Sequence, residues 1–391
     1  MQPAVHPGSL SLQCPMSLHI GIECDRGGAG RVISELMTHL PEAGFGFRGI
    51  VANSPNGQVS DARVSYFASA ESGLFTRLQK ARTSIRSALV EFKPDIVASH
   101  FAMYSAPGLD LLKDTRTISH FHGPWSEESL QEGDNHIAVA AKSCLEAAVY
   151  RRSNRVIVLS NAFGELVTTR FGVDPGRVRL VPGSVNTKRF ALETSREDSK
   201  IALNLPLDRP ILVTVRRLVN RMGLASLIDA MTQVVTAVPD VLLCIAGEGR
   251  LKETLQTQVE AQGLTRNVRF LGFVPEDALP HLFYAADINV VPTIALEGFG
   301  LVAAEAMATG TPSMVTPVGG LPEVVGGLSR RLIFSGTKAP DIAEGLIGAL
   351  NGTIQLPARR ECREYIQNNF NSRLMALRTA EVYRELIEEE P

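Results

Sequence analysis

At 391 residues, with 45% hydrophobic and 20% charged residues, the chain has the composition of a globular protein and the length of two ordinary domains. A formal net charge of -2 argues against a nucleic-acid partner, and no apolar run approaches the ~20 residues of a membrane span. The five scattered cysteines lack C-x-x-C spacing, which argues against a disulfide framework and a zinc site and favours a reducing, cytoplasmic compartment.

The first half of the chain alternates between short apolar runs and amphipathic stretches. Residues 1–15 lack the basic and apolar regions of a signal peptide, so we predict a disordered leader there, or a true start at Met16. Strands that alternate with helices form a parallel sheet covered on both faces, and we predict such a Rossmann-like domain over residues 16–185. The runs that predict its strands are 18–23, 49–53, 62–68, 95–99, 117–121, 155–160 and 178–182.

A glycine-rich turn follows the first predicted strand. Gly27 and Gly28 stand between that strand and an amphipathic helix over residues 32–40. Such a turn lets the backbone approach a phosphate or a substrate. It also suits a tight connection that needs a positive φ, and the spacing leaves both interpretations open.

A second helix is predicted over residues 73–92. One of its faces is basic and carries Arg77, Lys80, Arg82 and Arg86. A basic face is typical of a solvent-exposed helix. It also suits a weak peripheral contact with an anionic membrane.

The run H-G-P-W places His122 directly after a predicted strand, because Gly-Pro forces a turn there. We expect His120 to point to the opposite face of that strand as a structural residue. His122 itself fits either a site residue or a turn-capping histidine. Glu127 and Glu128 follow in a segment that could bind an acceptor or lie in solvent.

The α/β pattern restarts at Pro210, after a polar stretch over residues 183–199 that we interpret as a linker. We therefore predict a second Rossmann-like domain over residues 186–365, and a C-terminal helix over 366–391 that crosses back to the first domain. In open α/β sheets, ligands bind beyond the carboxyl ends of the strands, so the two halves should share one interdomain cleft. The strand runs are 211–215, 241–246, 268–272, 288–292 and 313–316, with helices over 224–238 and 301–309.

Two carboxylates bracket the start of the helix over residues 301–309. Glu297 precedes the helix and Glu305 lies inside it. A helix N-terminus offers free N–H groups to an anion, and a buried carboxylate needs partners such as sugar or ribose hydroxyls. We interpret this segment as a nucleotide-sugar site. The alternative is a surface helix start with favourable negative charge, which fits Glu297 better than Glu305 because Glu305 has apolar neighbours.

Several motifs occur in a fixed order along the chain. They are G-G-A-G-R-V at 27–32, S-H-F-H-G-P-W-S-E-E-S at 119–129, P-G-S-V-N-T-K-R-F at 182–190, V-R-R-L-V-N-R-M-G-L at 215–224, I-A-G-E-G at 245–249, F-L-G-F-V-P-E-D-A-L-P-H-L-F-Y-A-A-D at 270–287 and E-x7-E at 297–305. Together they resemble the retaining, nucleotide-sugar-dependent glycosyltransferases of family 4, in particular a bacterial subgroup with the H-F-H-G-P-W run. The resemblance covers residues 16–386 and implies the GT-B fold, in which two doubly wound Rossmann-like domains face an interdomain cleft.

The resemblance implies roles for individual residues of the second domain. Arg217 would grip the donor diphosphate through its planar fork of N–H groups. The family usually has a lysine where this chain has Met222, and Arg221 would replace it. Glu305 would accept hydrogen bonds from the ribose, and Glu297 would hold a hydroxyl of the donor sugar.

Other roles follow from the same resemblance. His122 would bind the donor sugar and shape the acceptor pocket, and Gly28 would let the first-domain loop approach the diphosphate. Arg216 is expected to be a bystander, because neighbouring side chains at a strand end point to opposite sides. The remaining donor contacts would come from Phe273, Val274, Phe299, Gly300 and Leu301, and the acceptor contacts from Gly27, Trp125, Glu127 and Glu128.

The implied reaction moves a sugar from a UDP- or GDP-linked donor to a small-molecule or glycan acceptor, with retention at the anomeric carbon, in bacterial secondary-metabolite or polysaccharide biosynthesis. His122 and Glu297 are the catalytic candidates. The site residues include no DxD-type motif, so neither a metal nor another cofactor is expected. Two alternatives stay open: a nucleotide-sugar epimerase or hydrolase on the same scaffold, and a non-catalytic nucleotide-binding subunit.

Overall fold

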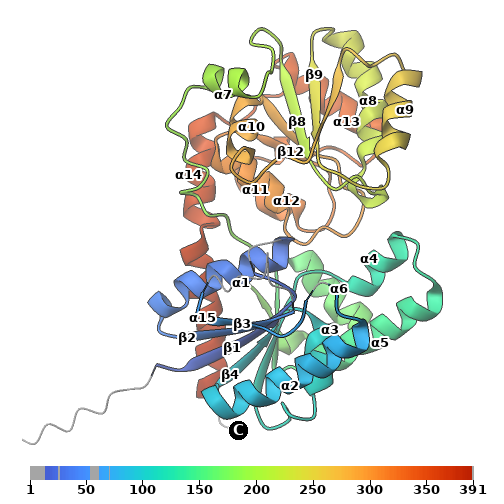
Figure 1. Cartoon of the computed structure of the whole chain (residues 1–391). Helices are drawn as coiled ribbons and strands as arrows, with labels where there is room; N and C mark the ends of the chain where they lie inside the picture. Colours follow the sequence, from blue (N-terminus) through green and yellow to red (C-terminus); the bar gives the residue numbers. More distant parts are fainter. Residues whose placement is uncertain (1–13, 25–26, 53–60, 70, 390–391) are drawn as a thin grey trace, which may run out of the picture.

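The structure, a computed structural model, describes residues 14–24, 27–52, 61–69 and 71–389. Figure 1 shows two α/β bodies, one above the other, with the C-terminal helix (red) running alongside the lower body. The predicted leader over residues 1–15 lies almost entirely outside the described residues.

The lower body contains a sheet of seven strands. They are β1 (Met16–Gly21), β2 (Gly46–Val51), β3 (Val64–Tyr66), β4 (Ile96–Ser99), β5 (Arg116–Phe121), β6 (Arg155–Val158) and β7 (Val178–Leu180). All neighbours are parallel, in the order β3-β2-β1-β4-β5-β6-β7. The central strand β4 is buried along its whole length, as a parallel strand covered on both faces requires.

Helices cover both faces of this sheet. They are α1 (Gly27–His39), α2 (Leu74–Phe92), α3 (Ala102–Ser105), α4 (Trp125–Gln131), α5 (His136–Arg152) and α6 (Asn161–Phe171), with 3-10 turns η1 (Pro41–Ala43), η3 (Ala106–Gly108) and η4 (Pro175–Arg177). Ile33 and Leu36 of α1 share a buried core with Tyr383 from the end of the chain. Ala81 and Ile85 of α2 belong to a second core on the other face. The sheet is therefore doubly wound.

The upper body contains a sheet of five parallel strands, β8 (Ile211–Val215), β9 (Leu242–Ala246), β10 (Val268–Gly272), β11 (Ile288–Val291) and β12 (Ser313–Val315). Their order is β10-β9-β8-β11-β12. Successive strands are added on one side of β8 and then on its other side, and a crevice forms at the carboxyl end of the sheet where this order reverses. The helices and turns around this sheet are α7 (Arg196–Ala202), η5 (Asn220–Met222), α8 (Leu224–Ala237), α9 (Lys252–Ala261), α10 (Leu279–Ala285), α11 (Leu301–Ala308), α12 (Leu321–Val325), η6 (Arg330–Leu332), α13 (Ala339–Leu350) and α14 (Arg359–Asn369).

Each of these twelve strands overlaps a run predicted from the sequence, and the prediction of two doubly wound parallel sheets is confirmed. Two expectations differ from the structure. The stretch over residues 183–199 is not only a linker, because α7 begins at Arg196, where the Ser195 side chain accepts from the Asp198 N–H. The C-terminal segment forms two helices, because the Asn371 side chain caps a new helix, α15 (Ser372–Glu388), at the Leu374 N–H.

The two bodies touch beside the cleft. Glu323 of α12 accepts hydrogen bonds from the backbone N–H groups of Asn161 and Ala162, at 2.9 and 3.1 Å, and so serves the free N-terminus of α6 in the lower body. A Cβ atom on Gly298 would lie 2.5 Å from the Phe163 ring. A glycine at this position therefore allows the Glu297 loop to lie directly against the lower body.

Candidate active site

The carboxyl ends of both sheets face one cavity of about 710 Å³. A smaller cavity of about 120 Å³ adjoins it and shares His122, Glu297 and Leu301 with it. Of the residues predicted for the site, the two cavities together are lined by Gly27, Gly28, His122, Glu128, Arg217, Arg221, Phe273, Val274, Glu297, Phe299, Gly300, Leu301 and Glu305. The structure thus brings most of the predicted residues to one cleft.

The Glu297 loop leads into α11 through a glycine in the left-handed conformation. Gly300 has φ +87, and a Cβ atom there would lie 2.4 Å from Leu321 Cδ2. Only glycine tolerates both the positive φ and the close approach of Leu321, so the turn that starts α11 depends on Gly300. Glu305 follows inside this helix and is 3% exposed.

Glu305 is paired across the cleft with Arg31 of α1. Arg31 Nη1 donates to Glu305 Oε1, and Arg31 Nη2 lies 2.5 Å from Glu276 Oε1. Burial raises the pKa of Glu305 to about 7, and the positive charges of Arg31 and Arg189 oppose that rise. An arginine of the lower body therefore holds the buried carboxylate of the upper body.

Glu297 is paired with Arg216. Arg216 Nη2 donates to Glu297 Oε2, and the Thr293 hydroxyl lies 3.4 Å from the same oxygen. The expectation that Arg216 is a bystander was wrong. The backbone leaves the strand after Val215, so period-two alternation no longer sets the direction of the side chain, and Arg216 turns into the cleft beside Arg217.

The loop after β8 supplies two further arginines. Arg217 is half exposed and its Nη1 lies 3.7 Å from Glu132 Oε1 of the lower body. Arg221 is buried, donates to the Leu296 carbonyl at 3.0 Å, and its Nη2 lies 3.1 Å from Glu128 Oε1. Burial lowers the pKa of Arg221 and raises that of Glu128, while each group opposes the shift of the other.

Three buried polar atoms at this cleft have no hydrogen-bond partner among the described residues. They are the Nε atoms of Arg216 and Arg221 and the Nδ1 atom of His122. An unpaired buried polar atom is unfavourable and is rare in folded proteins. Two unpartnered guanidinium N–H groups on residues that line one cavity suit an anionic ligand such as a diphosphate.

The cavity is also lined by an exposed aromatic ring and by two glycines. Phe273, beyond the end of β10, is 74% exposed although it is large and apolar. Gly27 and Gly28 line the same cavity from the lower body, and Cβ atoms on them would meet no atom of the described residues within 4 Å. An exposed aromatic ring and an uncovered glycine turn leave space for a flat base and for phosphates.

His122 lies in the cleft, but its neighbours differ from the expectation. His120 shares its face of the sheet, with the two rings 6.2 Å apart and 14° from parallel, because residues two apart on a strand point the same way. The expectation of opposite faces was wrong. His120 is buried and its Nε2 lies 3.1 Å from the Tyr383 hydroxyl of α15, in agreement with a structural role.

Two residues expected on the acceptor side lie outside the cleft. The Trp125 ring packs against Phe101, at 5.3 Å between centroids, and Lys142 Nζ lies 4.7 Å above it. Glu127 pairs with Arg170 at 2.5 Å. Both side chains are held by the α4 region of the lower body, since the turn after Pro124 starts α4 and directs only Glu128 towards the cleft.

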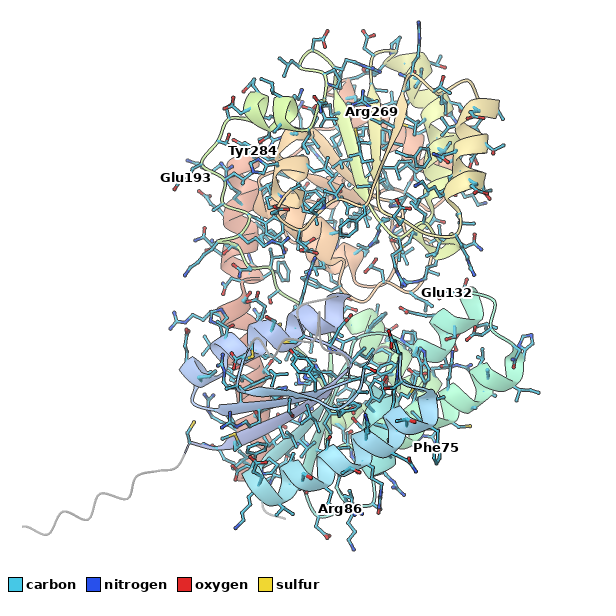
Figure 2. The ribbon with its side chains drawn as sticks, in the orientation of Figure 1. Phe75, Arg86, Glu132, Glu193, Arg269 and Tyr284 are labelled. Carbon is cyan, nitrogen blue, oxygen red and sulfur yellow. The ribbon has the colours of Figure 1, made fainter. Side chains whose placement is uncertain are left out.

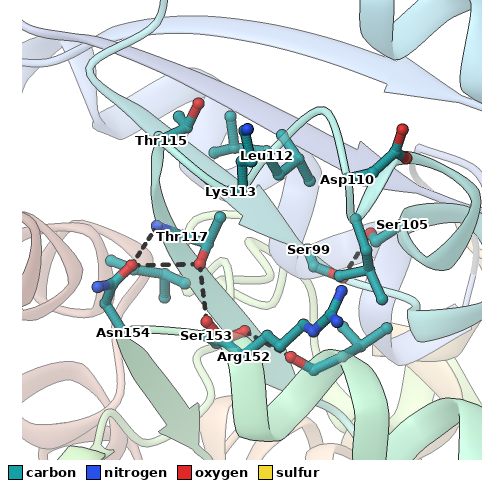
Figure 3. A pocket seen from close by; sticks show the side chains of 14 residues that line it. Ser99, Ser105, Asp110, Leu112, Lys113, Thr115, Thr117, Arg152, Ser153 and Asn154 are labelled. Carbon is teal, nitrogen blue, oxygen red and sulfur yellow. Dashed lines mark hydrogen bonds between the residues drawn. The ribbon is translucent and has the colours of Figure 1, made fainter.

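The lower body also contains a separate cavity of about 460 Å³ between its sheet and α5 (Figure 3). Its polar lining includes Thr117 and Asn154, whose side chains are hydrogen-bonded at 3.2 Å, and Ser99, which bonds Ser105 at 2.6 Å. Thr117 lies near the start of β5, whereas His122 follows the end of that strand. This cavity has no lining residue in common with the cleft cavities.

Comparison with known families matches both bodies. Residues 26–189 match the model of Glycosyltransferase Family 4, and residues 195–369 match that of Glycosyl transferases group 1. The chain is a family 4 glycosyltransferase. The two matches fall on the two sides of the cleft, and the transferase has the GT-B architecture predicted from its motifs.

Individual relatives agree with this assignment. The transferase is 29% identical over 308 residues to the D-inositol 3-phosphate glycosyltransferase of Corynebacterium urealyticum, over 75% of this chain and 72% of that protein. It is 34% identical over 176 residues to an uncharacterized glycosyltransferase of Methanocaldococcus jannaschii, where the match spans 44% of this chain and 45% of the relative. An Anabaena protein solved in complex with UDP and glucose has a similar fold, with a TM-score of 0.78 at 17% identity, over 95% of this chain and all of the other.

Sequence reasoning missed three charged residues of this cleft: Arg31, Glu276 and Arg216. Arg31 lies within the G-G-A-G-R-V motif, three residues after Gly28, and Glu276 lies two residues after Val274. Their place beside recognised motifs was a signal that could have identified them. Their partners could not be predicted from the sequence, because Arg31 and Glu305, for example, are 274 residues apart.

Proposed function

We propose that this glycosyltransferase transfers a sugar from a nucleoside-diphosphate donor to a small-molecule or glycan acceptor, with retention at the anomeric carbon. The observation that carries the proposal is the set of unpartnered buried atoms on Arg216, Arg221 and His122 around one cavity. The arginines suit the diphosphate, whose negative charge increases as the bond to the sugar breaks. These cations supply the countercharge, so we propose that the reaction uses no metal cofactor.

We place the donor along the wall formed by the upper body. The ribose hydroxyls would donate to Glu305 and a sugar hydroxyl would donate to Glu297, each displacing the arginine that now holds the carboxylate. The base would lie on Phe273 and Val274. Gly28 and the N-terminus of α11 at Leu301 would approach the phosphates and the sugar from opposite sides.

We place the acceptor between His122 and Glu128 of the lower body, the predicted acceptor-side residues that reach the cleft with Gly27. No carboxylate is assigned as a nucleophile, so a double displacement of the glycosidase kind is not proposed. The acceptor would react on the face of the sugar that the diphosphate leaves, and the leaving phosphate would receive its proton.

The pathway and location are part of the same proposal. We propose a cytoplasmic role in bacterial secondary-metabolite or polysaccharide synthesis, which the free cysteines favour. None of the helices in the described ranges is long and apolar enough to cross a membrane. A peripheral contact remains part of the proposal, because Leu74 and Phe75 of α2 are 59% and 73% exposed on the helix that also presents Arg86 (Figure 2).

Thermal-shift measurements with UDP, GDP, ADP and TDP and their sugars test the donor site. A ligand at 100 times its Kd stabilises the folded protein by about 2.7 kcal/mol, so the correct donor should raise Tm clearly and the others should not. Incubation of that donor with candidate acceptors should then release the nucleoside diphosphate and a glycosylated product of retained configuration. Release of an epimerised sugar without any acceptor would instead establish the epimerase.

A further inference from the structure

Three neighbouring strands of the lower sheet each place one histidine in a row that ends at the cleft. His19 lies on β1, His100 follows β4, and His122 follows β5, in the strand order β1-β4-β5. The ring planes lie within 28° and 17° of parallel, with centroids 5.2 Å apart for His19 and His100 and 5.3 Å apart for His100 and His122. His19 is fully buried and His100 is 4% exposed.

Hydrogen bonds join the row from end to end. His122 Nε2 lies 3.0 Å from His100 Nδ1, and His100 Nε2 lies 2.9 Å from His19 Nδ1. His19 Nε2 lies 3.0 Å from Ser17 Oγ, and the Ser17 hydroxyl donates to the Gly46 carbonyl at 2.8 Å. The other end of the row, His122 Nδ1, has no partner among the described residues.

All three rings are neutral at neutral pH. Burial lowers the pKa of His19 to about 3 and that of His122 to about 4, and it lowers the pKa of His100 well below its usual value. A neutral imidazole carries one N–H donor and one bare nitrogen acceptor. Each bond in the row must therefore run from the single N–H of one ring to the bare nitrogen of the next.

The Gly46 carbonyl decides the direction of the row, because a carbonyl only accepts. Ser17 uses its one hydroxyl hydrogen on Gly46, so Ser17 must accept from His19 Nε2–H. The bare His19 Nδ1 then accepts from His100 Nε2–H, and the bare His100 Nδ1 accepts from His122 Nε2–H. This leaves His122 Nδ1 bare.

We propose that Ser17, His19 and His100 are positioning residues that fix His122 as its Nε2–H tautomer, so that Nδ1 offers only a lone pair to a hydroxyl of the bound substrate. This step rests on the proposed function, because it places a sugar or acceptor hydroxyl at His122. The row ends at a peptide carbonyl, which is a very weak base, so the row orients His122 and does not carry a proton away.

The test measures the tautomer in the free protein, which needs no activity. Two-bond nitrogen–proton correlation spectra of protein labelled with 15N-histidine should show His122 with its proton on Nε2. A parent protein with the proton of His122 on Nδ1 would overturn the proposal. This result would leave nucleotide binding and glycosyl transfer, which are measured separately, unaffected.

The Ser17→Ala variant tests whether Ser17 sets the tautomer of His122 through His19 and His100. Without the hydroxyl, His19 Nε2 loses its acceptor and the row can reverse, so that His122 presents N–H to the cleft. We expect a changed His122 tautomer pattern and a kcat lowered about two- to tenfold, with an unchanged Kd for the nucleoside diphosphate.

Ser65→Ala is the matched control, because Ser65 also faces a backbone carbonyl, that of Gly49 at 3.4 Å, on the neighbouring pair of strands. It should leave both the tautomer and kcat as in the parent. If Ser17→Ala also left both unchanged, or if Ser65→Ala changed them equally, the proposed control by the row would be wrong.

Discussion

Arg31 of the lower body and Glu305 of the upper body form an ion pair across the cleft, and both side chains are largely buried. Under the proposed placement of the donor, the ribose would displace Arg31 from this carboxylate. The pair would then couple the stability of the protein to the occupancy of the donor site.

Arg31→Met should destabilise the protein, because it leaves the buried Glu305 carboxylate without its main partner. Loss of one member of a buried pair costs about 3–5 kcal/mol, and partial protonation of Glu305 should reduce this at neutral pH. Denaturant unfolding at pH 8 and pH 5 measures the effect, which should be larger at pH 8. The Arg31→Met/Glu305→Gln double variant should recover part of the loss, whereas additive losses would show that the two residues are not coupled.

Glu305→Gln should change how stability depends on pH. The pKa of Glu305 in the folded protein is about 7 and its usual value is 4.5, so its favourable contribution is complete below pH 4.5 and is lost as pH rises through 7. The difference corresponds to about 3 kcal/mol. Between these pH values the parent should therefore lose stability relative to the glutamine variant, and parallel stability curves would contradict the assigned pKa.

Arg217→Ala should weaken binding of the nucleoside diphosphate. A charge-assisted hydrogen bond contributes about 1.5–3 kcal/mol, so Kd should rise roughly 10- to 150-fold in isothermal titration calorimetry. Arg269 is a suitable control, because it is exposed on β10, donates to the Asn204 carbonyl at 2.8 Å and lies away from the cleft (Figure 2). Equal affinity in Arg217→Ala and Arg269→Ala would show that the diphosphate binds elsewhere.

His122→Ala should lower turnover more than donor affinity. The imidazole would contact a substrate hydroxyl through a single nitrogen, so we expect kcat to fall about 10- to 100-fold and the Kd for the nucleoside diphosphate to stay within about twofold. His136 is exposed at the start of α5 and provides the matched substitution. If nucleotide affinity fell by the same factor as kcat, we would conclude that His122 contacts the nucleotide and not the sugar.

Gly223→Ala should disrupt the arginine loop. Gly223 has φ +70, and its Cβ atom would lie 1.8 Å from the Pro292 carbonyl oxygen, so the backbone that carries Arg221 must move. Gly352 has nearly the same conformation, φ +75, but a Cβ atom there meets no atom of the described part of the chain within 4 Å. Gly352→Ala should thus cost about 1 kcal/mol, and Gly223→Ala should cost more and also abolish nucleotide binding. If both variants lost the same free energy of unfolding and Gly223→Ala still bound the nucleotide, the loop that carries Arg221 would have to accommodate the added methyl group.

The amino-acid sequence by itself determined the secondary structure and most of the members of the cleft. Strand β8, for example, is a buried run at the residues predicted, because period and propensity are properties of adjacent residues. Glu297, Glu305 and His122 were found for a related reason. His122 directly follows β5, and Glu297 and Glu305 lie in the loop and the helix that follow β11. The carboxyl ends of parallel strands meet at one edge of a sheet.

Only the tertiary structure decided which of these side chains face one another. The direction of Arg216, the outward packing of Trp125 and the Arg31–Glu305 pair depend on contacts between distant parts of the chain. The histidine row shows the same limit, because His19, His100 and His122 become neighbours only through the strand order β1-β4-β5. Hydrogen bonds depend on distances in space, and no local pattern in the sequence sets the distance between residues on different strands.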